Sequence, residues 1–200
     1  MSASFRLPSA PCASRADSSA MSAMTLTLEE GVAVPHSFDI WTESPASVEE
    51  IHGALGREDY WLTRLATSDA TTTLDSLIVE ADGTVAVRVT QHLGRQLLPG
   101  AVAKLLPGDL KILHRETWRP VDDGQVRGQV SVSASGGFGS GRGEVWLAPA
   151  RIGSQTRFAV RVEVKIPFVG GRFEKSIAAG LAESIREIQR FTTKWIAEHA

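Results

Sequence analysis

The fold of this chain is decided by its C-terminal stretch, VGGRFEKSIAAGLAESIREIQRFTTKW, residues 169–195. Its apolar residues recur at steps of three or four, at Val169, Phe173, Ile177, Leu181, Ile185, Ile188, Phe191 and Trp195. This spacing predicts one helix of up to about 28 residues, near 42 Å long, with a single apolar stripe. A helix with one apolar side needs a long apolar surface to pack against.

The segments before this helix alternate apolar and polar residues, which is the pattern of half-buried strands. We predict six strands, over residues 74–80, 84–93, 110–119, 125–133, 143–148 and 157–166. Asp82-Gly83, between the first two, is a strong hairpin signal. Such alternation predicts an antiparallel sheet with one solvated and one buried face, and the buried face supplies the surface that the helix needs.

A strand and two short helices are predicted before these six strands. Residues 34–42 alternate as a strand, and Ser44-Pro45 then predicts a helix start, with Ser as N-cap and Pro at the first position. The first short helix carries Val48, Ile51 and Leu55 and ends at Gly56. The second carries Tyr60, Trp61, Leu62 and Leu65.

The predicted order is strand, two helices, six strands and a long helix, which makes an α+β domain over residues 34–200. This order resembles the helix-grip fold of the START-like (SRPBCC) superfamily, which includes the birch-pollen allergen and polyketide cyclase/dehydrase proteins. Within it the chain looks most similar to an uncharacterised bacterial family of unknown function. The likeness is carried by Pro35-His36-Ser37-Phe38, Leu105-Leu106-Pro107-Gly108, Glu116-Thr117-Trp118 and the terminal helix.

The resemblance implies a curved seven-stranded antiparallel sheet that grips the helix, with a cavity for a hydrophobic molecule between them. Strand parity in residues 110–119 places one alternating set on the inner face: Leu110, Ile112, His114, Glu116 and Trp118. The cavity candidates are His114, Glu116, Trp118, Gln91, Ile112, Val162, Phe173 and Ile177.

His114 and Glu116 are the most informative of these residues, because their Cα atoms lie about 6.6 Å apart on one face of a strand. A His–carboxylate pair in an apolar cavity is an acid/base couple in one interpretation. In the other it is an ion pair that is structural or positions a ligand, and we favour this second interpretation. Gln91 is a third candidate polar contact.

Two copies of Leu-Leu-Pro-Gly, at residues 97–100 and 105–108, flank a short apolar helix candidate. Hydrophobic turns with Pro-Gly suit a lid over a cavity mouth, formed by Leu97, Leu98, Leu105 and Leu106. A packed connection between strands is an equal alternative. An exposed apolar patch here would instead contact a protein partner or, transiently, a membrane surface.

Composition excludes several classes of function. The 200 residues carry 21 Lys+Arg against 23 Asp+Glu, a net charge of −2 that argues against a nucleic-acid binder. The single cysteine, Cys12, excludes an intramolecular disulfide and a Cys-based zinc site. The five histidines show no metal-ligand spacing, and the glycine-rich segment 136–143 lacks the phosphate-loop pattern and is interpreted as a hairpin or bulge. We predict neither a metal nor another cofactor.

The first 33 residues contain seven Ser and seven Ala with no apolar period, which predicts a disordered tail. A second hypothesis is that this tail is not translated in the cell. Glu29-Glu30-Gly31 requires purine-rich codons that resemble a ribosome-binding site, so that Val34 becomes a GTG start, with Met21 and Met24 as competing starts. No signal-peptide pattern and no run of roughly 18 apolar residues occurs, which predicts a cytoplasmic protein without a membrane span.

Three functions remain open at this point. The leading hypothesis is a non-enzymatic binder or carrier of a hydrophobic small molecule such as a lipid, polyketide or isoprenoid, which rests on fold analogy. The second is an aromatase/cyclase-type enzyme in which His114 and Glu116 transfer protons. The third is a protein-interaction module that uses residues 94–108, and the sequence leaves the oligomeric state open.

Overall fold

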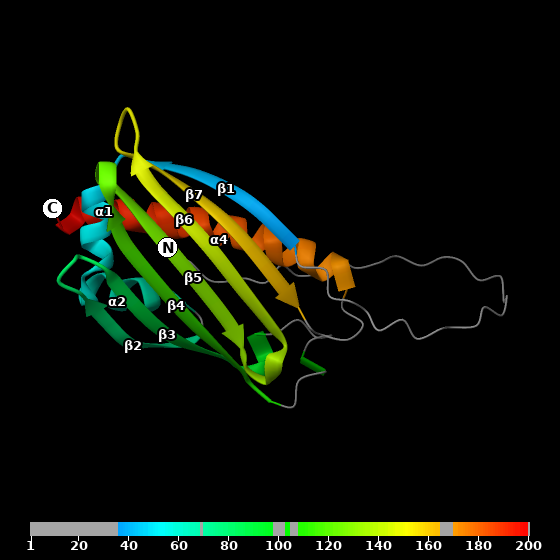
Figure 1. Cartoon of the computed structure of the whole chain (residues 1–200). Helices are drawn as coiled ribbons and strands as arrows, with labels where there is room; N and C mark the ends of the chain where they lie inside the picture. The colour runs from blue at the N-terminus through cyan, green and yellow to red at the C-terminus, as the bar shows by residue number, and fades with distance from the viewer. Residues whose placement is uncertain (1–35, 69, 98–102, 105–107, 165–169, 200) are drawn as a thin grey trace, which may run out of the picture.

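The computed structural model describes residues 36–68, 70–97, 103–104, 108–164 and 170–199, with the backbone alone for His36, Leu97, Val164 and residues 170–179 (Figure 1). Its main elements follow the predicted order: β1 (His36–Ser44), α1 (Val48–Leu55), α2 (Glu58–Leu65), β2 (Thr71–Val79), β3 (Val85–Leu93), β4 (Leu110–Val121), β5 (Gln125–Ala134), β6 (Gly139–Pro149), β7 (Ser154–Val164) and α4 (Gly170–His199).

The seven strands form one antiparallel sheet in the order β1-β7-β6-β5-β4-β3-β2. Figure 1 shows this sheet curving around α4, with α1 and α2 at the end of the sheet where α4 finishes. The architecture confirms the predicted helix-grip fold. It follows from the two periods in the sequence, since each strand turns one alternate set of side chains toward the single apolar stripe of the helix.

The start of α1 differs from the prediction. The N-cap is Ser47 rather than Ser44: its Oγ accepts from the Glu50 N–H at 3.1 Å, and Glu50 Oε2 accepts from the Ser47 N–H at 2.7 Å. These reciprocal hydrogen bonds are a capping box, which satisfies two backbone donors where Ser44 and Pro45 would satisfy fewer. Ser44 is the last residue of β1 and hydrogen-bonds Thr193 of α4 at 2.8 Å.

The main core lies where α1, α2 and α4 meet the inner face of the sheet. Tyr60 and Trp61 of α2 are 0% and 1% exposed, and the described part of the α4 stripe is buried at Ile185 and Trp195. Burial of aromatic side chains of this size is a main source of stability in a domain of this length. The predicted stripe is therefore confirmed where its side chains are described.

Polar contacts on the underside of α4 were not expected from the stripe. Gln189 Nε2 donates to Thr42 Oγ1 at 2.7 Å and to Thr156 Oγ1 at 3.0 Å, which ties α4 to β1 and β7. The Tyr60 hydroxyl shares a 2.8 Å hydrogen bond with Thr192 Oγ1. Because buried polar groups need partners, these pairs also restrict the rotation and register of α4 against the sheet.

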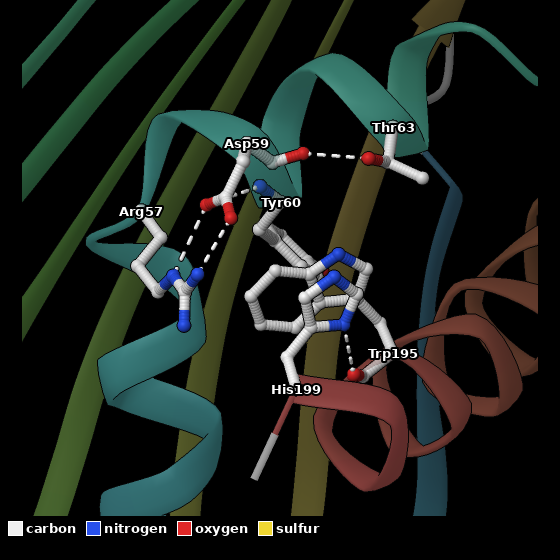
Figure 2. Close-up of polar contacts among 6 residues, drawn as sticks. All are labelled: Arg57, Asp59, Tyr60, Thr63, Trp195 and His199. Atoms are coloured by element: carbon white, nitrogen blue, oxygen red, sulfur yellow. Dashed lines mark hydrogen bonds and ion pairs between the residues drawn. The ribbon is translucent and has the colours of Figure 1, made fainter.

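The C-terminal turn of α4 is held against α2, as Figure 2 shows. The rings of Trp195 and His199 stack with centroids 4.1 Å apart, and the Arg57 guanidinium lies 4.8 Å from the Trp195 ring centroid. Arg57 is held in turn by Asp59, whose Oδ2 is 2.6 Å from Arg57 Nη2 and whose Oδ1 accepts from the Tyr60 N–H at 3.0 Å. These contacts fix the C-terminal turn of α4 against α2.

Candidate ligand-binding cavity

A cavity of about 330 Å³ lies between the inner face of the sheet and α4. Its wall is largely apolar, and its members come from β4, β5, β7 and α4: Ile112, Val130, Val132, Phe158, Val160, Val162, Leu181, Ile185 and Ile188. The residues predicted to lie on the inner face of β4 all line this cavity: Leu110, Ile112, His114, Glu116 and Trp118.

Glycines on β6 leave the volume of this cavity unfilled. Gly139, Gly141 and Gly143 line the cavity at alternate positions of the strand, followed on the same face by the side chains of Val145 and Leu147. A Cβ at Gly141 or Gly143 would meet no neighbouring atom closer than 3.8 Å or 3.7 Å, so side chains are absent here where there is room for them. The cavity therefore depends on missing side chains rather than on a gap between badly packed ones.

The predicted start of this strand is too late. The alternation predicted a strand from residue 143, with residues 136–143 as a hairpin or bulge, whereas β6 begins at Gly139. The turn itself is shorter and uses the left-handed backbone at Gly136 and Gly137, both with φ of 72°. Glycine lowers strand propensity, and pairing with β5 and β7 on both sides overrides that local preference.

One cluster of charged and polar side chains interrupts the apolar wall. Glu116 is 7% exposed, and its Oε2 accepts a hydrogen bond from Trp118 Nε1 at 3.0 Å. Its Oε1 lies 3.6 Å from Arg64 Nη2 and 3.7 Å from His114 Nδ1. Arg64 and His114 both line the cavity, so the guanidinium and the imidazole can also contact a bound molecule.

Arg64 belongs to this charged cluster and was not predicted from the sequence. It lies on α2, and its guanidinium also sits 4.7 Å from the Trp61 ring centroid. The sequence did contain a signal for Arg64, because this residue is four positions after Tyr60 and therefore shares its face of the helix. What the sequence did not show is that this face of α2 points at the inner side of β4.

The carboxylate of Glu116 is ionised at neutral pH. Burial raises its pKa, but Arg64, His114 and the Trp118 hydrogen bond lower it by more, and the net result is a pKa below the usual 4.5. Burial lowers the pKa of Arg64, and the neighbouring Tyr60 and Glu116 outweigh that effect and raise it. The cavity wall thus contains a buried ion pair with an imidazole beside it.

The remaining predicted site residues are placed as follows. Gln91 is on the inner-face parity of β3 but is not part of the cavity wall, and its Nε2 lies 3.2 Å from Ser68 Oγ. The side chains of Phe173, Ile177 and Leu97, and all of Leu98, Leu105 and Leu106, lie outside the described residues. The lid therefore stays a prediction.

Within the described ranges of the chain, no three His, Cys, Asp or Glu side chains are grouped so that they could hold a metal ion. Among the described helices, none is long and apolar enough to cross a membrane.

Residues 39–196 match the family model described as protein of unknown function, DUF2505. The chain belongs to this family. An uncharacterized protein of Mycobacterium tuberculosis is 36% identical to this DUF2505 protein over 173 residues, which cover 83% of this chain and 99% of the relative.

Solved structures show the same fold at low sequence identity. The Staphylococcus aureus protein of unknown function SA2116 aligns at 11% identity and a TM-score of 0.53, over 84% of this chain and 96% of its own. Ara h 8.0201 aligns at 15% identity and a TM-score of 0.51, over 82% and 99%. This DUF2505 protein thus has the START-like fold that its sequence resembles.

The depressed pKa of Glu116 predicts a specific loss of stability in acid. The stabilisation that depends on its charge is fully present above the unfolded-state pKa, near 4.5, and is lost as the pH falls through the lower folded-state value. We expect the difference in unfolding free energy between wild type and Glu116→Gln to be constant above about pH 6 and to shrink below about pH 4.5. Urea unfolding from pH 7 to pH 3 measures it, and a difference that grows in acid would contradict the assignment.

Proposed function

We propose that this DUF2505 protein binds a small hydrophobic molecule that carries one oxygen-containing polar group. The observation that carries the proposal is the largely apolar cavity of about 330 Å³ with the cluster of Glu116, Arg64 and His114 on its wall. Ligand pockets typically enclose about 300–1,000 Å³ and combine apolar walls with a few polar groups that orient the ligand. The volume favours a compact ligand, such as a short lipid, polyketide or isoprenoid.

In this proposal the polar cluster orients the ligand. Glu116 lies beside Arg64 and His114 at the cavity wall, and the N–H donors of these two side chains favour an acceptor oxygen as the polar group of the ligand. A ligand carbonyl or hydroxyl there would accept a hydrogen bond from these donors. An apolar body in the remaining space would displace water from the apolar wall.

The aromatase/cyclase alternative is less well supported. Proton transfer needs a group whose pKa is near the working pH, whereas Glu116 has a lowered pKa and three partners that favour its ionised form. These contacts suit a fixed charge that positions its neighbours. Turnover of a polyketide substrate that is lost in both His114→Phe and Glu116→Gln would favour the enzyme instead.

Filling the space above Gly141 should weaken ligand binding. We expect wild type to bind the neutral fluorescent probe N-phenyl-1-naphthylamine at one saturable site and to quench tryptophan emission, because Trp118 is on the cavity wall. Gly141→Leu should weaken this binding at least about tenfold, a cost of roughly 1.4 kcal/mol or more. Fluorescence titration measures both.

The matched control is Ser133→Leu on the neighbouring strand β5, where the side chain is exposed and is not part of the cavity wall. It adds a larger side chain without occupying the cavity, so probe affinity should stay within about twofold of wild type. Equal binding by wild type and Gly141→Leu, with both folded, would refute the cavity as the binding site.

His114→Phe should change which ligands bind rather than whether the protein folds. His114 is 38% exposed and Glu116 keeps Arg64 and Trp118, so the cost in unfolding free energy should be about 1 kcal/mol or less. We expect wild type to prefer 1-acetylnaphthalene over 1-ethylnaphthalene, which differs by one carbonyl, and the variant to lose about threefold or more of that preference. An unchanged preference would remove His114 from the site.

A further inference from the structure

The outer face of the sheet carries a row of arginines, of which only Arg142 also borders the cavity. The strand register pairs Arg88 with Arg115, Arg115 with Ser131, Ser131 with Arg142, and Arg142 with Arg161. One straight row across five neighbouring strands therefore holds four arginines and one serine, and it runs for about 19 Å at the usual strand spacing.

This row lacks the countercharges that would normally accompany it. Like charges directly opposite each other on paired strands destabilise a sheet. Within the described residues, no carboxylate lies within 4.0 Å of any of the four guanidinium groups, and all four side chains are exposed.

Other arginines on the same face do have partners. Arg157 pairs with Asp39 at 3.2 Å and lies 5.1 Å from the Trp146 ring centroid, and Arg127 lies 5.4 Å from the same ring. Some arginines of this face are thus paired, whereas the four of the row have no carboxylate partner among the described residues.

A hollow of about 770 Å³ lies over this row. It is lined by Arg115, Arg142 and Arg161, and by polar side chains that include Ser131, Gln129 and Glu144. A guanidinium fork matches the oxygens of a phosphate group with two parallel hydrogen bonds, which an ammonium group does not do. Arg115 and Arg142, two strands apart, are separated by about 10 Å, so one molecule with two anionic groups can engage both.

We propose that this hollow binds a small molecule with two or more phosphate groups, on the face opposite the apolar cavity. A small molecule fits better than an extended polyanion or a bilayer surface, because the exposed carboxylates of Glu144 and Asp39 line the same hollow. They repel a continuous array of phosphates on that side. Glu144 is at the same time an acceptor for a ligand hydroxyl group.

Inorganic tripolyphosphate is the probe that tests the site. Isothermal titration at low salt should show saturable one-to-one binding to wild type, at least about tenfold tighter than inorganic phosphate. Arg142→Gln should weaken it at least about tenfold, since a hydrogen bond to a charged group is worth about 1.5–3 kcal/mol. Arg142→Lys should fall between the two, because it keeps the charge and loses the fork.

The control is Arg119→Gln, which removes the same charge from an exposed position of β4 that is not part of the hollow. It should change the affinity by less than about twofold. Because Arg142 has like-charged neighbours and no carboxylate partner, Arg142→Gln should keep or raise the melting temperature, so unfolding does not explain its loss of binding.

Three results would overturn the proposal. The first is no saturable binding of tripolyphosphate, and the second is an equal loss in Arg119→Gln and Arg142→Gln, which would mean general charge attraction. The third is tighter binding to phosphatidylserine vesicles or to a single-stranded oligonucleotide than to tripolyphosphate, which would mean an extended partner. Gly141→Leu, which fills the cavity, should leave tripolyphosphate binding unchanged, so this site and the cavity can fail separately.

Discussion

The Arg64→Leu variant should lose about 3–5 kcal/mol of unfolding free energy, near the lower end because the cavity gives water access to the cluster. The change removes the cation that lies 3.6 Å from Glu116, whose side chain is only 7% exposed. A buried carboxylate without its countercharge is costly, and one hydrogen bond from Trp118 replaces little of the lost interaction. Urea unfolding at pH 7 measures the loss.

A double variant shows whether charge or packing is responsible. Arg64→Leu combined with Glu116→Leu replaces the pair by apolar side chains, which is often neutral or stabilising for buried ion pairs. We expect the double variant to recover more than half of the stability lost by Arg64→Leu. If instead the two losses add, the contribution of Arg64 comes from packing, for example on the Trp61 ring.

The second large effect is expected at the centre of α4. Ile185 is 7% exposed and lines the cavity between helix and sheet. Ile185→Ala should destabilise the protein by about 2–5 kcal/mol, nearer the lower value because one side of the residue already faces open space. Denaturant unfolding with both variants at the same pH measures the cost.

Arg186→Ala is the matched control on the next residue, which is exposed and faces away from the sheet. Its effect should be within about 0.5 kcal/mol of zero. Similar losses in the two variants would mean that the stripe is not the packing face, and that general helix propensity explains the result.

Much of the fold could be predicted because periodicity reports which side of an element is buried. Steps of three and four placed Ile185 and Trp195 on one face of α4, and both are buried. Alternation in residues 110–119 likewise put His114 and Glu116 on the inner face of β4, where they line the cavity. Their part in ligand binding stays a prediction that the variants above test.

Local sequence signals predicted the wrong element boundary where two signals competed, or where pairing with a neighbouring strand determined the boundary. Ser44 and Ser47 are both acceptable N-caps, and the reciprocal bonds with Glu50 selected Ser47. The glycines from 139 to 143 look like a turn in sequence, yet pairing with two neighbouring strands extends β6 through them. A strand in the middle of a sheet gains hydrogen bonds on both edges, which outweighs weak propensity.

The sequence by itself determined the order of the elements, the buried face of each one and the inner-face pair on β4. Only the tertiary structure decided that α2 brings Arg64 to Glu116, that three glycines leave the cavity open, and that four arginines align across the outer face. The physical reason is that periodicity is a property of one segment, which its own sequence specifies. Contacts between segments depend on strand register and helix packing, which the whole chain sets together.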